Sequence, residues 1–298
     1  TDAEKQQQAT DKFDQVYEVD QDIITEFNRV KGDIKPAVSP ARPRKLLIYS
    51  VSHGPHSFGI PTGNAILEIL GNETGAYTAV VSDDLANFEP DALKQFDAVC
   101  FANTTGEVFY RPVERELFDK LSAEEQQRQV ANAERLVNNL TEYVRGGGGF
   151  FGIHAATDTL KKNPVYGEMI GGYFDGHPWS GSQTVKVRIE RPDHPLCKNI
   201  FPGDGFTIKD EIYQMKAPYS RDKLQVLLSL DFEQSEKPGK PIKREDKDFP
   251  LSWTKPYGKG HVFYSALGHN KNTFANPLVL QHWLNGLQYV MGDMPVDH

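Results

Sequence analysis

The chain has 298 residues, of which 38% are hydrophobic and 11% aromatic, enough to form one large core or two smaller ones. Its formal net charge of -8 disfavours a nucleic-acid partner, because a protein holds a phosphate backbone through a concentrated excess of Lys and Arg. No stretch approaches the roughly 20 apolar residues that span a bilayer. We therefore expect neither nucleic acid nor membrane as a partner, and no nucleotide cofactor.

The chain contains two cysteines, Cys100 and Cys197, too few for a disulfide framework and without the spacing of a metal-binding pair. Cys100 lies in an apolar run, where a free cysteine packs as a small hydrophobic residue. Neither cysteine precedes a small-residue helix start, as a nucleophile on a tight turn does. A cysteine hydrolase is therefore only a minor alternative.

Residues 1–44 are predicted to form a separate arm. Apolar residues between Phe13 and Val30 recur at three- and four-residue steps, which favours an amphipathic helix, and prolines between positions 36 and 43 end it in a stiff connection. We expect the arm to pack on the domain or on a partner subunit of a homo-oligomer. The Gln-rich opening after Thr1 is compatible with an exported, periplasmic protein that has lost its signal, and also with a cytoplasmic one.

From residue 45 onward, predicted strands alternate with predicted helices. The strands are expected over 45–50, 77–82, 96–103 and 150–154, and the helices over 62–70 and 112–144. This alternation predicts an α/β domain over 45–292 with a flavodoxin-like, doubly wound, mainly parallel sheet. The second half contains additional predicted strands, at 183–190, 206–213, 224–230, 251–254 and 261–266, before a final helix at 277–291. Residues 233–248 form the expected flexible insertion.

The segment 146–158 combines four glycines, a short apolar strand and small residues that open a helix. This is the pattern of a nucleophile elbow, which exposes a catalytic side chain at the end of a strand. Class I glutamine amidotransferases place a cysteine there, whereas this chain has His154. A histidine does not perform thioester chemistry, so we expect no glutaminase activity. His154 is instead a candidate metal ligand or general acid/base, with a purely packed histidine as the alternative.

Further histidines lie in turns or strand ends that the parallel sheet would bring to one edge: His53, His56, His177 and His269. Imidazoles with a carboxylate from Asp158, Asp175 or Glu211 would suit Zn²⁺ or another divalent transition metal. The predicted ligands of this metal are His154, His177 and His269. The remaining histidines lack such settings and are expected to be structural: His194, His261, His282 and His298.

Asp210 and Glu211 are adjacent carboxylates in the strand predicted over 206–213. Successive side chains of a strand point to opposite faces, so only one of them can face the site. We favour Glu211 as the catalytic residue, with Tyr213 on the same face. A solvated strand edge is the alternative.

A series of ordered blocks resembles the ThuA-like (trehalose utilisation) family, over residues 148–158, 171–178, 210–213, 250–253, 257–264 and 267–269. The resemblance extends over about residues 45–292. It implies a class I glutamine amidotransferase-like fold without amidotransferase activity, and a role in the use of trehalose and other disaccharides. By the same implication the substrate is a glycoside or a 3-keto sugar.

A ketone at the third carbon of a sugar acidifies the protons beside it. A metal or histidine that polarises the ketone, together with a base, would support lyase, hydrolase or isomerase chemistry. In this hypothesis His154 and His177 hold the metal or ketone, and Glu211 or Asp158 acts as base. The predicted substrate-binding residues are His53, His56, Tyr173, Trp179, Tyr213 and Trp253, with the two tryptophans and Tyr173 as an aromatic platform for the sugar. A non-catalytic carbohydrate-binding or regulatory module is the alternative.

Overall fold

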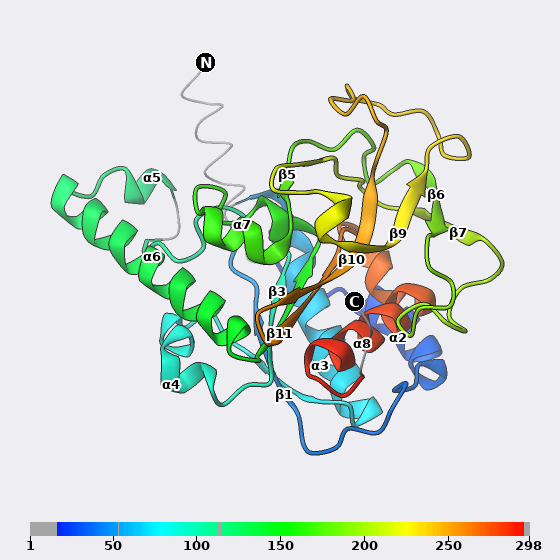
Figure 1. Ribbon diagram of the computed structural model, residues 1–298, viewed down its shortest axis with the longest axis horizontal. Coiled ribbons are helices and arrows are strands. Elements are labelled where there is room, and N and C mark those ends of the chain that lie inside the picture. Colours follow the sequence, from blue (N-terminus) through cyan, green and yellow to red (C-terminus); the bar gives the residue numbers. More distant parts are fainter. Residues whose placement is uncertain (1–16, 53, 113–114, 295–298) are drawn as a thin grey trace.

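The computed structural model describes residues 17–52, 54–112 and 115–294. A mixed sheet of nine strands runs through the centre of the molecule in the order β2-β1-β3-β4-β11-β10-β9-β6-β7 (Figure 1). Helices α2, α3 and α8 gather on one side of it and α4, α6 and α7 on the other. His53, one of the predicted substrate-binding residues, lies outside the described residues.

The first five strands of this order are parallel: β2 (Thr78–Val81), β1 (Lys45–Tyr49), β3 (Ala98–Ala102), β4 (Gly149–Ile153) and β11 (Gly260–Ser265). Numbered along the chain within the parallel group, they follow the flavodoxin order 2-1-3-4-5. Strands β3 and β4 are buried at every position, as expected for strands covered by helices on both faces. The predicted α/β fold with a doubly wound parallel sheet is confirmed.

The sheet continues through four antiparallel strands: β10 (Pro250–Tyr257), β9 (Gln225–Asp231), β6 (Thr184–Ile189) and β7 (Gly205–Lys209). A separate two-stranded sheet pairs β5 (Tyr173–Phe174) with β8 (Met215–Lys216). The strand predicted over 206–213 ends at Lys209. Asp210 and Glu211 therefore do not lie in a strand, and the expected alternation of their faces does not apply.

The helices are α2 (Gln21–Val30), α3 (Ile60–Thr74), α4 (Pro90–Leu93), α5 (Arg115–Phe118), α6 (Ala123–Arg145), α7 (Pro164–Ile170) and α8 (Pro277–Val290). The single helix predicted over 112–144 is wrong, because the chain forms α5 and α6 there. Ser122 begins α6 with a capping box: its hydroxyl accepts from the Glu125 amide, and the Glu125 carboxylate accepts from the Ser122 amide. This cap begins a new helix at Ala123 and so interrupts the helical periodicity predicted over 112–144. No described helix is both long and apolar enough to cross a membrane.

The described part of the N-terminal arm packs on its own domain. Ile23 and Phe27 of α2 are buried, and α2 lies against α3 and the short helix η6 (Lys271–Ala275). The Asp20 amide donates to the Thr62 hydroxyl at 2.9 Å, and Lys271 pairs with the Asp20 carboxylate at 3.0 Å. The arm therefore contacts η6 immediately after the turn that carries His269.

Candidate functional site

His154 stands at the carboxyl end of β4, on the turn predicted from the glycine break. It begins the short helix η4 (His154–Asp158) with φ of 46°, a left-handed value that a residue other than glycine seldom adopts. Its side chain is fully buried. The elbow-like turn is confirmed, and it places an imidazole at the edge of the sheet where doubly wound folds bind ligands.

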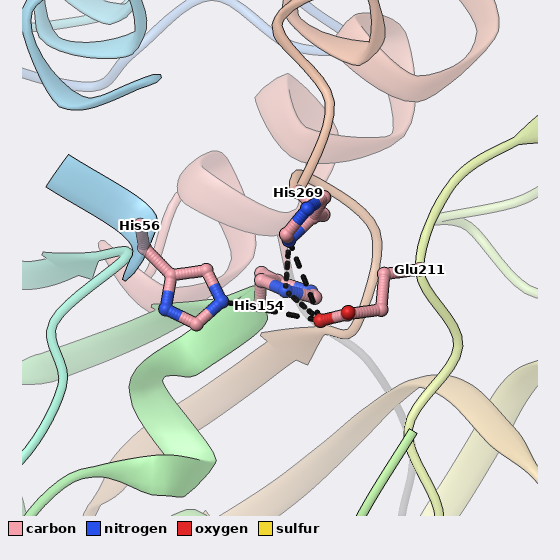
Figure 2. Close-up of side chains that lie close together, drawn as sticks. All are labelled: His56, His154, Glu211 and His269. Carbon is pink, nitrogen blue, oxygen red and sulfur yellow. Dashed lines mark hydrogen bonds and ion pairs between the residues drawn. The ribbon is translucent and has the colours of Figure 1, made fainter. Parts of the chain in front are cut away.

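Four side chains from distant parts of the chain converge at this edge: His56, His154, Glu211 and His269 (Figure 2). One donor atom from each lies within 4.8 Å of all the others. The Glu211 Oε2 atom is 3.4 Å from His154 Nε2, 3.4 Å from His269 Nδ1 and 4.0 Å from His56 Nε2. His269 Nδ1 is 3.3 Å from His154 Nε2.

These distances fit a tetrahedral metal site. Donors bound to Zn²⁺ at about 2.0–2.1 Å lie about 3.3–3.4 Å apart along each edge of a tetrahedron. The His154, His269 and Glu211 donors have that spacing, whereas His56 is the loosest of the four. Two imidazoles and a glutamate, with the fourth position open, form a ligand set found in catalytic zinc sites.

The hydrogen bonds around the ring of His154 direct a lone pair into this cluster. His154 Nδ1 lies 2.7 Å from the Ala266 carbonyl, which can only accept, so Nδ1 carries the proton and Nε2 faces Glu211. Metal-bound histidines are commonly oriented in this way by a carbonyl or carboxylate. A lone pair that faces a buried carboxylate is unfavourable unless a cation or proton lies between them.

His56 is held differently, since both of its ring nitrogens have neutral partners. Its Nδ1 lies 3.0 Å from the Thr105 hydroxyl and its Nε2 lies 3.1 Å from the Tyr213 hydroxyl. The Tyr213 ring also packs against His154 at 4.2 Å between centroids. Tyr213 thus lies at the site, as expected, and His56 belongs to the four-donor cluster rather than only to the substrate-binding residues.

Asp210 holds the turn that carries His269. Its carboxylate is fully buried and accepts from the amides of Gly268 (2.7 Å) and Asn270 (2.9 Å) and from the Thr273 hydroxyl (3.0 Å). Burial raises its pKa. The sequence pattern did not predict this role, because it indicated a strand over 206–213 in which Glu211 faces the site and Asp210 points to the opposite face.

His177 is not part of the four-donor cluster, in contrast to the prediction. Its Nδ1 lies 2.7 Å from Glu211 Oε1, the carboxylate oxygen that faces away from the other histidines. Its Nε2 lies 2.7 Å from Lys240 Nζ. His177 lies in the turn after β5 and contacts the Glu211 oxygen opposite the one that the cluster shares. The third imidazole of the cluster is His56 instead.

The electrostatics of the cluster keep Glu211 ionised and oppose protonation of His269 and His56. Burial raises the pKa of Glu211, but hydrogen bonds from His154 and His56, and the charges that His154 and His269 carry when protonated, more than offset it, and the pKa lies well below its usual range. Burial, together with the neighbouring histidines, lowers the pKa of His269 to about 4. Burial also lowers the pKa of His56. Neutral imidazoles with an ionised carboxylate are the protonation states that bind metals.

Asp158 lies at the end of η4 and forms an ion pair with Lys161. It is not among the four donors.

The cysteines are both buried, and burial raises the pKa of Cys197 to about 12, so this thiol stays protonated at neutral pH.

The predicted aromatic platform is not formed by the expected residues. Trp179 and Trp253 are fully buried and donate to the carbonyls of Glu236 and Ile170. Tyr173 is 6% exposed, and its hydroxyl donates to the Leu160 carbonyl. These rings pack in the core, so they have no open face for a sugar.

Solvent reaches the cluster from the side of His177 and His269, whose side chains are 28% and 19% exposed. A separate hollow of about 680 Å³ is lined by Arg44, Asp97 and Gly148, among others. These residues precede β1, β3 and β4, so the hollow lies at the opposite edge of the sheet and does not serve the cluster.

The sequence model of the ThuA family, described as trehalose utilisation, matches residues 118–290, more than half of the chain. The chain belongs to the ThuA family. The match includes His154, Glu211 and His269, whereas His56 and the N-terminal arm precede it. No curated protein matches the chain.

Solved structures support the ThuA-like fold. A putative ThuA-like protein from Bacteroides uniformis is 22% identical with a TM-score of 0.61, over 86% of this chain and 94% of its own. Another from Parabacteroides merdae is 18% identical with a TM-score of 0.55, over 84% and 91%. A cytoplasmic protein from Salmonella typhimurium is also 18% identical, with a TM-score of 0.53 over 83% and 98%.

Proposed function

We propose that this ThuA-family chain is a metal-dependent enzyme of carbohydrate metabolism that acts on a glycoside or 3-keto sugar. The observation that carries the proposal is the convergence of His154, His269 and Glu211 at tetrahedral spacing. They would hold Zn²⁺ or a similar divalent metal, with His56 beside the fourth position. When bound, such a metal polarises a ketone or hydroxyl oxygen.

The acid/base residue that the geometry favours is His177. Glu211 accepts from His177 Nδ1, as the acidic residue of a hydrolase triad does from its histidine, and this leaves the Nε2 lone pair facing outward. Lys240, an exposed residue of the loop between β9 and β10, now lies at that nitrogen. A substrate that displaces Lys240 would bring its proton to His177 Nε2. This assignment replaces Asp158 as base, because Asp158 pairs with Lys161 instead.

The test is the metal content of purified protein, measured by inductively coupled plasma mass spectrometry. We expect near-stoichiometric metal in the unaltered chain and its loss in His154→Ala and His269→Ala. The matched control is His177→Ala, which removes an adjacent imidazole but no ligand, and should retain the metal. Absence of metal from protein never exposed to a chelator would contradict the proposal.

Catalysis is tested on the metal-loaded protein with a 3-keto disaccharide, by following release of the monosaccharide or loss of the ketone. His177→Ala should retain metal and lose at least about a hundredfold in rate, as expected for removal of a general base. Binding of the sugar without turnover would instead indicate the non-catalytic carbohydrate-binding module.

A further inference from the structure

We infer that Phe58 and Phe174 form the sugar-binding walls of this site and recognise the apolar face of a pyranose ring. This inference rests on the proposed function. It assigns the aromatic platform to two rings other than those predicted, and both flank the exposed side of the cluster.

Phe174 occupies its place because strand residues alternate. Its neighbour in β5, Tyr173, is directed into the core, where its hydroxyl bonds to the Leu160 carbonyl. Phe174 therefore points to the other face of the strand. There it lies 4.4 Å from the Tyr213 ring and 6.2 Å from the His177 ring, between centroids. It is half-buried, in contrast to Tyr173.

An exposed lysine covers the Phe174 ring. Lys161 Nζ lies 5.5 Å from the ring centroid, and its side chain is 41% exposed. A cation and the C–H groups of a sugar are attracted to the same electron-rich face of an aromatic ring. Lys161 is exposed but pairs with Asp158, so in this inference a sugar displaces its ammonium group from the Phe174 ring, and the ammonium group then donates to the sugar hydroxyls.

Phe58 lies in the short helix η2 (Pro55–Gly59), which also carries His56. Its ring is 5.6 Å from that of His269, between centroids, and it is half-buried. His269 and His177 both contact the Glu211 carboxylate, one at each oxygen. The two phenylalanines thus lie beside His177 and His269, the two most exposed of the histidines that contact the Glu211 carboxylate.

This arrangement has the chemistry of a sugar subsite. Apolar ring faces lie next to polar groups that can bond to hydroxyls, namely His177, Lys240 and Lys161. Sugars present C–H groups on their faces and hydroxyls around their rims, so they match such a surface. The other aromatic residues at the cluster do not offer this, since Tyr213 is buried.

The experiment is saturation-transfer NMR of metal-loaded protein with trehalose and with D-glucose as probes. We expect strong transfer to the ring C–H protons, and roughly tenfold weaker binding in Phe58→Leu and in Phe174→Leu. Leucine retains apolar bulk but lacks a flat face. The matched control is Phe201→Leu, which alters a half-buried ring stacked on Phe206, elsewhere in the molecule. Its binding should be unchanged, as should the metal content of all variants.

Binding to the unaltered protein that persists equally in both site variants would overturn this inference and leave the proposed function intact. Absence of binding of both sugars to the metal-loaded protein would overturn the inference together with the carbohydrate part of the proposed function. Equal loss in Phe201→Leu would show an indirect effect and also overturn it.

Discussion

Two regions of the molecule bury histidines, and they do so for different reasons. At the interior face of α8, His282 Nδ1 bonds to the Leu196 carbonyl at 2.7 Å, and its Nε2 to the Ser252 hydroxyl at 2.9 Å. Both nitrogens have a complementary partner. At the carboxyl edge of the parallel strands, His154 has one such partner, and its other nitrogen faces Glu211 and His269.

The comparison shows that burial alone does not identify a functional histidine. His154 and His282 are 0% and 1% exposed, so exposure does not separate them. What separates them is the direction of their second lone pair. A satisfied imidazole stabilises the fold, whereas imidazoles that converge on a carboxylate leave a place for a cation.

The largest expected contrast is between truncations of these two residues. His282→Ala should lower the free energy of unfolding by about 2–5 kcal/mol, because it leaves a cavity and two unpaired polar groups. His154→Ala, measured without metal, should lower the free energy of unfolding by roughly 1 kcal/mol or less, since it also removes the unfavourable approach of the Nε2 lone pair to the Glu211 carboxylate. Urea unfolding of both variants measures this. Equal costs would show that the cluster is as structural as His282.

Metal removal should destabilise only a protein with an intact cluster. At a free metal concentration of a hundred times Kd, binding adds about 2.7 kcal/mol to the free energy of unfolding. A chelator should therefore lower the melting temperature of the unaltered chain and of His177→Ala, and leave that of His154→Ala unchanged. Thermal scans with and without chelator test this. A shift retained in His154→Ala would place the metal elsewhere.

Acid should lower the free energy of unfolding, because His282 is buried as a neutral imidazole. Burial lowers its pKa from 6.5 to about 4, so the unfolded chain binds the proton first. Its contribution to stability is complete above pH 6.5 and decreases as the pH falls toward 4, by about 1.4 kcal/mol per pH unit and about 3 kcal/mol in all. His282→Gln should show a shallower loss than the unaltered chain over this range. Parallel slopes would contradict the assignment.

The smallest effect concerns the N-terminal arm. Asp20→Ala removes the partner of Lys271, which follows the His269 turn by two residues. Because both side chains are partly exposed, this pair should contribute little to stability. We expect metal affinity to fall by only a few fold, as measured by competition with a chromophoric chelator. A loss as large as that of His269→Ala would make the arm a required part of the site.

Much of the site was predictable because parts of it follow from local pattern. The glycine break and short apolar strand predicted the turn at His154, and the order of strands predicted that loops bearing His56 and His269 would meet. Glu211 was expected to face the site, but for the wrong reason, since it lies beyond β7 and not in it. The neighbouring Asp210 shows why: its hydrogen bonds to the His269 turn are long-range contacts.

The sequence alone determined the α/β class, the parallel half of the sheet and the position of His154, because strand and turn preferences act within a few residues. The tertiary structure decided which histidines form the four-donor cluster with Glu211. His177 and His56 have similar glycine-rich settings, and only their approach to Glu211 from opposite sides separates them. The tertiary structure also buried Tyr173 and left Phe174 half-buried beside His177. Such choices depend on packing between segments far apart in the chain, which no local pattern encodes.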